Sequence, residues 1–157
     1  MIKSVRSANL MAKKVLIIGG RRALNAAEDK IRAYVAKTNL EIIGTKIYGT
    51  DCTYATVEKL RELPEYEEAD MVFGVGGGKA LDTVKCLCIT DDKPVFAFPT
   101  IASNCAACTS VSIMYNDDGT FRSQTFLCVR SCIPSLTRRS SQRHQASICG
   151  LASAIPM

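Results

Sequence analysis

Four short apolar runs constrain the fold of this chain more than any other feature. They are KKVLIIGG (13–20), LEIIGTKIYG (40–49), DMVFGVGGG (70–78) and KPVFAFPT (93–100). Runs that are apolar almost throughout indicate strands buried on both faces, and strands that alternate with helices connect in parallel. Apolar residues at helical spacing predict the intervening helices, at 23–39, 53–69 with a break near Pro64, and 79–90. We therefore predict an α/β fold with a doubly wound, mostly parallel sheet.

The rhythm changes after Thr100. Small residues fill IASNCAACTS (101–110), and VSIMYNDDGTFRSQTFLCV (111–129) predicts an added β-hairpin that turns at NDDG. From about residue 131 both the periodicity and the composition are lost. We therefore treat residues 131–157 as an aberrant tail, and disorder is the simplest interpretation of it.

Charge and hydropathy argue against several classes of function. The formal net charge is +5, and residues 130–143 contain four arginines and no acid, so a nucleic-acid interpretation would rest on that tail alone. No stretch reaches the roughly 18 to 20 apolar residues that span a bilayer, and the amino end lacks the apolar core of a signal peptide. We expect neither a nucleic-acid nor a membrane partner, a cytoplasmic location, and eight cysteines that are reduced thiols.

Three consecutive glycines, Gly76, Gly77 and Gly78, end the third run and precede a predicted helix. Parallel sheets bind ligands at such places, because a backbone without Cβ lets a phosphate approach and a helix amino end favours negative charge. Lys79 could add a cation, and Asp82 could accept from a hydroxyl. Close packing of the helix on the sheet explains the same glycines equally well. A second glycine turn, in IIGGRRAL, strengthens the phosphate interpretation because both turns lie on one sheet edge.

A second loop follows the next strand, so its hydroxyls should border the same crevice. These hydroxyls belong to Thr100, Ser103, Thr109 and Ser110. Together, GVGGGKALDTVK (74–85) and FPTIASNCAACTSVSIMYNDDG (98–119) resemble the iron-containing alcohol dehydrogenase and glycerol dehydrogenase family. The likeness covers about residues 13–129, and in that family the first segment binds the pyrophosphate of a nicotinamide cofactor.

The resemblance implies a Rossmann-like dinucleotide-binding domain at 13–130, after an atypical segment at 1–12. It implies hydride transfer between NAD or NADP and a small alcohol or carbonyl substrate, with a divalent metal, iron or zinc, that polarises the oxygen. It assigns the cofactor contacts to Gly77, Gly78, Lys79, Asp82, Thr100, Ser103, Thr109, Val111 and Tyr115. It assigns no catalytic residue within this chain.

Two departures from the family qualify these assignments. Glycerol dehydrogenases usually carry an acid that reaches the substrate where this chain has Cys105, so Cys105 is substrate-proximal and glycerol is in doubt. Many members also carry an acid after the first strand that holds the adenosine ribose. Here Gly19 and Gly20 precede Arg21 and Arg22, so no acid repels a 2′-phosphate and NADP stays open beside NAD.

The tail has a second explanation in the genetic code. A shifted reading frame permits DTEIIAKAP from Leu136 and DLWLGIGDT from Ser147, and both segments are similar to the family's continuation. The second contains the Gly-x-Gly-Asp segment that supplies a metal-binding Asp. We therefore hypothesise a frameshift near residues 130–133, which would truncate the chain before the family's helical metal-binding domain and leave its metal ligands missing. Early stop codons in the other frame of the gene would contradict this hypothesis.

The sequence is compatible with three functions. The first is the nucleotide-binding half of a metal- and nicotinamide-dependent dehydrogenase that is inactive by itself, and the second is a catalytically dead remnant that binds a dinucleotide. The third, less favoured, is a redox or zinc protein built on Cys105 and Cys108, although no second cysteine pair stands at a matching distance. The one histidine, His144, is interpreted as solvated. A sheet shortened at its edge also leaves homo-oligomerisation open.

Overall fold

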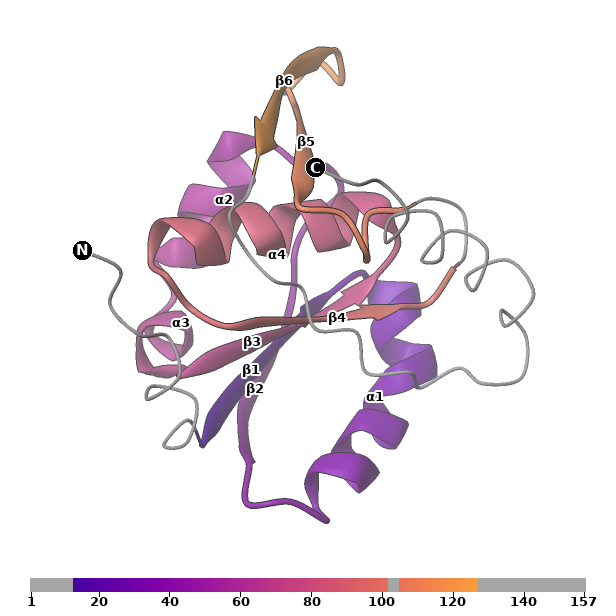
Figure 1. Cartoon of the computed structure of the whole chain (residues 1–157), viewed down its shortest axis with the longest axis vertical. Coiled ribbons are helices and arrows are strands. Elements are labelled where there is room, and N and C mark those ends of the chain that lie inside the picture. The colour runs from indigo at the N-terminus through magenta and orange to yellow at the C-terminus, as the bar shows by residue number, and fades with distance from the viewer. Residues whose placement is uncertain (1–12, 102–104, 127–157) are drawn as a thin grey trace, which may run out of the picture.

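The structure, a computed structural model, describes residues 13–101 and 105–126 (Figure 1). Four parallel strands form the central sheet, in the order β2-β1-β3-β4. The strands are β1 (Lys14–Gly19), β2 (Glu41–Ile47), β3 (Met71–Gly76) and β4 (Val95–Pro99). The predicted parallel sheet is confirmed. The third strand is shorter than its run, because Gly77 caps the next helix and Gly78 is that helix's first residue.

Helices cover both faces of this sheet. They are α1 (Arg21–Val35), α2 (Tyr54–Arg61), α3 (Pro64–Glu68) and α4 (Gly78–Thr90). In Figure 1, α1 lies below the sheet and α4 lies above it. The break near Pro64 is confirmed, since Pro64 begins α3, where the missing proline N–H costs no helical hydrogen bond.

Alternate residues of β1 face two separate hydrophobic cores. Leu16 and Ile18 belong to the core under α2, α3 and α4, whereas Val15 and Ile17 belong to the core under α1. All four side chains have no solvent exposure. The near-continuous apolar run of β1 therefore follows from burial on both faces, and the doubly wound prediction is confirmed.

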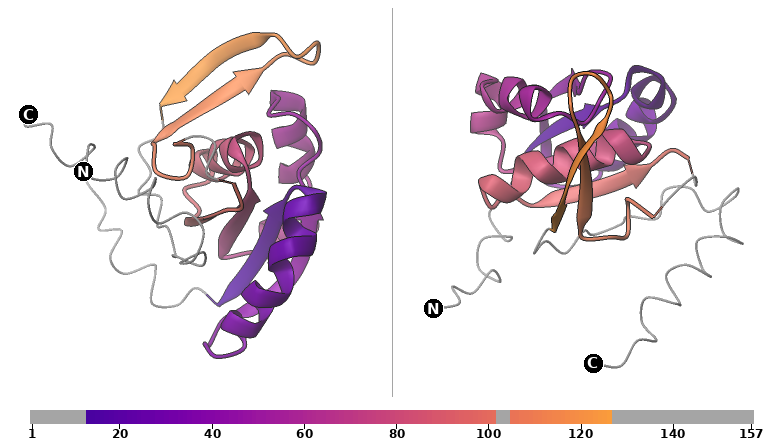
Figure 2. Two further views of the ribbon diagram at one scale, coloured as in Figure 1. Left: turned by 90° about the vertical axis from the view of Figure 1, so that its right-hand side faces the viewer. Right: turned by 90° about the horizontal axis from the view of Figure 1, so that it is seen from above.

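The predicted hairpin consists of β5 (Val111–Tyr115) and β6 (Phe121–Phe126), which pair in antiparallel fashion. Gly119 closes its turn with a φ of +82°, a conformation that glycine adopts without strain. The hairpin lies over α4, on the side away from the sheet (Figure 2). Met114 inserts into the core beneath, where it is fully buried.

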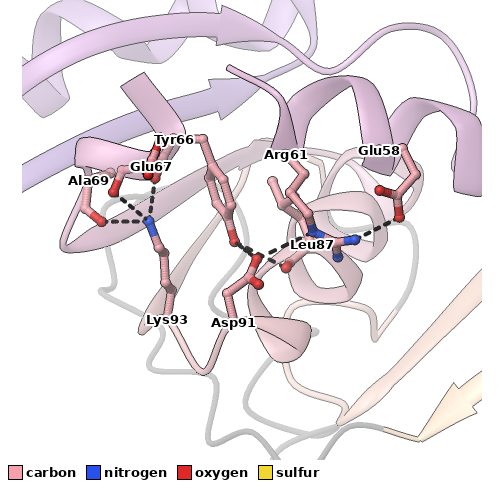
Figure 3. A network of polar contacts seen from close by, with 8 residues as sticks. All are labelled: Glu58, Arg61, Tyr66, Glu67, Ala69, Leu87, Asp91 and Lys93. Carbon is pink, nitrogen blue, oxygen red and sulfur yellow. Dashed lines mark hydrogen bonds and ion pairs between the residues drawn. The ribbon is translucent and has the colours of Figure 1, made fainter. Parts of the chain in front are cut away.

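A polar network joins the helices on this side of the sheet (Figure 3). The Lys93 ammonium, just before β4, donates to the carbonyls of Tyr66, Glu67 and Ala69 at the end of α3. The Tyr66 hydroxyl lies 2.8 Å from the Asp91 carboxylate, which follows α4. These contacts hold α3, the end of α4 and the start of β4 together.

Candidate functional site

The carboxyl ends of the four strands are joined to one another by backbone hydrogen bonds. Gly20 N–H donates to the Val75 carbonyl at 3.2 Å, and Thr100 N–H donates to the Gly76 carbonyl at 3.1 Å. On the outer side, Tyr48 N–H donates to the Gly19 carbonyl at 3.1 Å. We call this the carboxyl edge, formed by residues 19–20, 48–51, 76–79 and 100–101.

The centre of the carboxyl edge is a topological switch point. The adjacent strands β1 and β3 both end there, and the helices that follow them leave toward opposite faces of the sheet (Figure 1). A crevice opens between such diverging helices, and ligands of doubly wound proteins bind there. The two glycine turns predicted from the sequence are thereby brought side by side.

Close packing accounts for two of the glycines. A Cβ on Gly19 would stand 2.4 Å from the Val75 carbonyl oxygen, and one on Gly76 would stand 2.9 Å from the Ala80 Cβ. Gly76 also has a φ of +151°, which L side chains rarely adopt. The packing interpretation and the phosphate interpretation are therefore compatible, because the same bare backbone serves both.

The helices that begin at the two glycine turns have no side-chain cap. Gly20 caps α1 and Gly77 caps α4, and neither first turn contains an acid. By contrast, the hydroxyl of Thr53 accepts from Thr56 N–H at 3.2 Å at the start of α2. Helix N–H groups without an acceptor, together with the helix dipole, favour a bound anion.

Lys79 projects from the first turn of α4 with about half of its side chain exposed. Its ammonium forms an ion pair with Asp51, which follows β2, and lies 5.3 Å from the centre of the Tyr115 ring. The hydrogen bond from Lys79 lowers the pKa of Asp51, and the same bond raises the pKa of Lys79. Sequence reasoning missed Asp51, although its place just after a predicted strand was the available signal.

Asp82 lies beneath the carboxyl edge, between α4 and the hairpin, and is 7% exposed. Its Oδ2 accepts from Ile113 N–H at 3.3 Å, and its Oδ1 lies 2.8 Å from the Lys85 ammonium. That contact lacks hydrogen-bond geometry, so Oδ1 has no donor among the described residues. This oxygen is buried and ion-paired with Lys85, so the role of Asp82 in accepting from a hydroxyl stays a prediction.

The second loop is described in part. Thr100 meets the glycine turn through its N–H, and the half-buried Thr109 donates its N–H to the Cys105 carbonyl at 3.0 Å. The half-buried Val111 begins β5, and Cys105 is exposed. Ser103 lies outside the described residues. The structure thus gathers Gly77, Gly78, Lys79, Thr100 and Tyr115 at the edge, and places Asp82, Thr109 and Val111 beneath or beside it.

Two neighbouring features were not expected from the sequence. Ile101 is 58% exposed, and a Cβ on Gly77 would stand 2.8 Å from its Cδ1, so an apolar side chain borders the glycine turn. Tyr115 also lines an open groove of about 390 Å³ between the hairpin turn and the start of α2. Both features arise from contacts that the local sequence pattern does not encode.

Metal-binding groups do not gather in the part of the chain that the structure describes. Within residues 13–101 and 105–126, no three His, Cys, Asp or Glu side chains lie close enough to hold a metal ion. His144, the one histidine of the chain, lies outside these ranges. None of the helices within them is both long and apolar enough to cross a membrane.

A family model described as iron-containing alcohol dehydrogenase matches residues 3–137. The glycerol dehydrogenase of Thermotoga maritima is 39% identical over 114 residues, which cover 69% of this chain and 31% of that protein. Hydroxycarboxylate dehydrogenase A of Escherichia coli is 36% identical over 102 residues, which cover 65% of this chain and 27% of that protein.

Among solved structures, the glycerol dehydrogenase of Schizosaccharomyces pombe is similar to this chain with a TM-score of 0.66. The two are 27% identical, and the match covers 83% of this chain and 33% of that one. The chain therefore spans about a third of the length of the relatives it matches.

Proposed function

The chain belongs to the iron-containing alcohol dehydrogenase family, and we propose that its carboxyl edge holds the pyrophosphate of NAD or NADP. The whole protein would transfer a hydride between this cofactor and a small alcohol or carbonyl compound. The observation that carries the proposal is the pair of glycine turns at the switch point, each beginning a helix without a side-chain cap. Uncapped N–H groups and bare backbone are what a pyrophosphate requires.

The residues of the edge have distinct roles in this proposal. Gly77 and Gly78 present backbone N–H groups to the pyrophosphate, and Lys79 supplies a cation by sharing its charge between Asp51 and a phosphate. The resemblance to the family assigns Asp82 to accept from a hydroxyl of the cofactor, although its side chain is buried beside Lys85. Thr100, Ser103, Thr109, Val111 and Tyr115 complete the binding surface. The bound cofactor supplies or accepts the hydride, while these residues bind and orient it.

NADP is favoured over NAD by the surroundings of Gly20. A Cβ there would meet only the Tyr48 ring, at 3.6 Å, so the position has room and no acid occupies it. Arg21 and Arg22 are exposed in the same first turn of α1. A 2′-phosphate would therefore meet two cations and no carboxylate from this turn.

The proposal stays at the level of substrate class. The two curated relatives described above act, by their names, on glycerol and on hydroxycarboxylates. Cys105 replaces the acid of the glycerol enzymes and is exposed on the second loop, where we place the substrate. The described residues do not fit a metal ion, so no step of the reaction is assigned to one here.

Cofactor titration of the 157-residue chain tests the proposal. We expect NADPH to raise the melting temperature more than NADH does, and Lys79→Met to weaken binding of both by about ten-fold through loss of a phosphate contact. Gly20→Asp should reverse the preference, because the new carboxylate repels the 2′-phosphate and accepts from the ribose of NADH. If neither nucleotide changes the melting temperature or binds in calorimetry, the proposal is wrong.

A second candidate is a module that binds the dinucleotide without catalysis. The observation in its favour is that no three His, Cys, Asp or Glu side chains of the described residues lie close enough to hold a metal ion. Both candidates predict cofactor binding, but only a complete enzyme oxidises a small alcohol when iron or zinc is added. Binding without such turnover, in the 157-residue chain, would favour the module.

A further inference from the structure

Lys85 is a buried cation whose ammonium contacts three backbone carbonyls and the Asp82 carboxylate. Its side chain, in the third turn of α4, is 1% exposed. Its ammonium donates to the carbonyls of Ala106 at 2.8 Å, Thr109 at 3.2 Å and Val111 at 2.5 Å. A lysine ammonium has three protons, so these three carbonyls use all of them.

This geometry explains why Asp82 Oδ1 lies next to the Lys85 ammonium without accepting a hydrogen bond from it. The Asp82 carboxylate lies 2.8 Å from the ammonium and balances its charge, yet it receives no proton because the protons point to the loop. Burial of a charge without an opposite charge beside it is strongly unfavourable. The pair is therefore tolerated because both the charge and the three donors are satisfied.

The three carbonyls belong to the segment that links the sheet to the hairpin. They lie within residues 105–111, which comprise the end of the second loop and Val111, the first residue of β5. The internal contacts of the loop are short-range, since Cys108 N–H and Thr109 N–H both donate to the Cys105 carbonyl. Just after it, the Ser112 hydroxyl donates to the Asp82 carbonyl at 3.0 Å. Lys85 and Asp82 thus connect the second loop to the helix that begins at the phosphate-binding glycines.

We propose that Lys85 is a positioning residue that holds the second loop against α4 and so sets the spacing between the two halves of the cofactor site. The proposal rests on the proposed function, because the two halves are the glycine turn and this loop. Lys85 does not touch the cofactor. It acts by fixing the backbone of Thr109 and Val111, which the resemblance to the family assigns to the cofactor site, before the cofactor arrives.

A matched control exists at the opposite edge of the sheet. Lys93 also donates to three backbone carbonyls, those of Tyr66, Glu67 and Ala69, and none of them borders the carboxyl edge. Lys85→Met and Lys93→Met remove the same charge and the same number of donors. Because Lys85 is buried beside Asp82 and Lys93 is half-buried, their variants can lose different amounts of stability. A purely structural role for Lys85 predicts that neither variant changes the cofactor affinity of the folded chain.

The first measurement is cofactor affinity, at a temperature where each variant of the 157-residue chain is folded. We expect Lys85→Met to weaken NADPH binding by about ten-fold or more and Lys93→Met to change it less than two-fold, because only the former loses preorganisation of the site. Lys85→Gln, which keeps a donor without the charge, should lie between them, and it serves if Lys85→Met does not fold. Equal affinities in the Lys85 and Lys93 variants would overturn the proposal.

The second measurement is hydrogen exchange of the Cys108 and Thr109 amides, and it needs no cofactor. We expect about ten-fold faster exchange in Lys85→Met and unchanged exchange in Lys93→Met, because local opening follows the lost contacts. Protected amides in Lys85→Met would overturn the proposal.

The two measurements separate the proposal from the proposed function. If the natural chain binds neither NADH nor NADPH, the proposed function fails. In that case faster exchange confined to the second loop still shows that Lys85 holds this loop against α4, and unchanged exchange rejects that contact as well.

Discussion

At the scale of single residues, the glycines of the carboxyl edge are not equivalent. Gly19 and Gly76 have no room for a side chain, whereas Gly20 has room and Gly77 is limited by a flexible Ile101 side chain. Strand packing therefore requires the first two, and only the others are free to vary with the ligand. A glycine-rich sequence alone cannot make this distinction.

Gly19→Ala should be destabilising. Its Cβ would overlap the Val75 carbonyl oxygen, at 2.4 Å, and neither β1 nor β3 can shift without disturbing both cores. We expect the free energy of unfolding to fall by about 1–3 kcal/mol, the usual cost of overpacking, as measured by urea denaturation. Gly20→Ser is the matched control and should change it by less than about 0.5 kcal/mol. Equal stability of the natural chain and Gly19→Ala would contradict the packing argument.

The ion pair of Asp51 and Lys79 should make the stability of the chain depend on pH. Because Lys79 lowers the pKa of Asp51 in the folded chain, the stabilisation by this carboxylate is present above its unfolded pKa, about 3.9, and is lost as the pH falls through the lower folded value. In Lys79→Met the pKa of Asp51 should return toward its ordinary value. An NMR titration of the Asp51 carboxyl measures its pKa in the natural chain and in Lys79→Met. Lys30→Met, on the exposed face of α1, is the control and should leave this pKa unchanged. An unchanged midpoint in Lys79→Met would show that the pair does not form in solution.

At the scale of secondary-structure elements, one polar network decides how the short helix α3 is held. Burial raises the pKa of the Tyr66 hydroxyl, which remains neutral and lies 3.1 Å from the Leu87 carbonyl and 2.8 Å from Asp91 (Figure 3). The Lys93 ammonium lies 4.3 Å from the centre of the Tyr66 ring. A helix of five residues is too short to be stable alone, so these tertiary contacts hold it.

Tyr66→Phe removes the hydroxyl and keeps the ring under Lys93. We expect a loss of about 1 kcal/mol in the free energy of unfolding, the net worth of one hydrogen bond, by urea denaturation. Tyr34→Phe is the control, because the Tyr34 side chain on α1 is 56% exposed. If both variants lose the same amount of stability, the hydrogen bonds of the Tyr66 hydroxyl do not stabilise the fold.

At the scale of the whole molecule, the layers divide the cysteines into two classes. Cys52, Cys86 and Cys88 lie in the core beneath α2 and α4, whereas Cys105 and Cys108 are exposed on the second loop. Burial raises the pKa of the Cys52 thiol to about 12 and raises those of Cys86 and Cys88 as well. Cys52, Cys86, Cys88 and Cys105 are free cysteines in the part of the chain that the structure describes.

Alkylation at pH 8, followed by mass spectrometry of the peptides, should therefore separate the two classes. The folded chain should react at Cys105 and Cys108 while the three core thiols stay unmodified, because the reactive thiolate is scarce and covered there. The same reagent in denaturant should label all five. Rapid labelling of Cys52 in the folded chain would contradict this expectation. It would mean that α2 and α4 separate from the sheet often enough to expose the core.

The fold was largely predictable because its signals are local. Continuous apolar runs, helical spacing, the break at Pro64 and the turn at NDDG each lie within a few residues, and the structure confirms them. The place of the hairpin over α4 was not predictable. It depends on contacts such as that between Asp82 and Ile113, which lie 31 residues apart.

The sequence by itself determined the two glycine turns, the doubly wound fold class and the resemblance to the family, because residue type and spacing encode them. Only the tertiary structure decided which glycines packing requires, that Lys79 pairs with Asp51, and that Lys85 reaches the second loop. Those outcomes depend on which strand ends and loops meet in space, and strand order and the packing of α4 set that geometry.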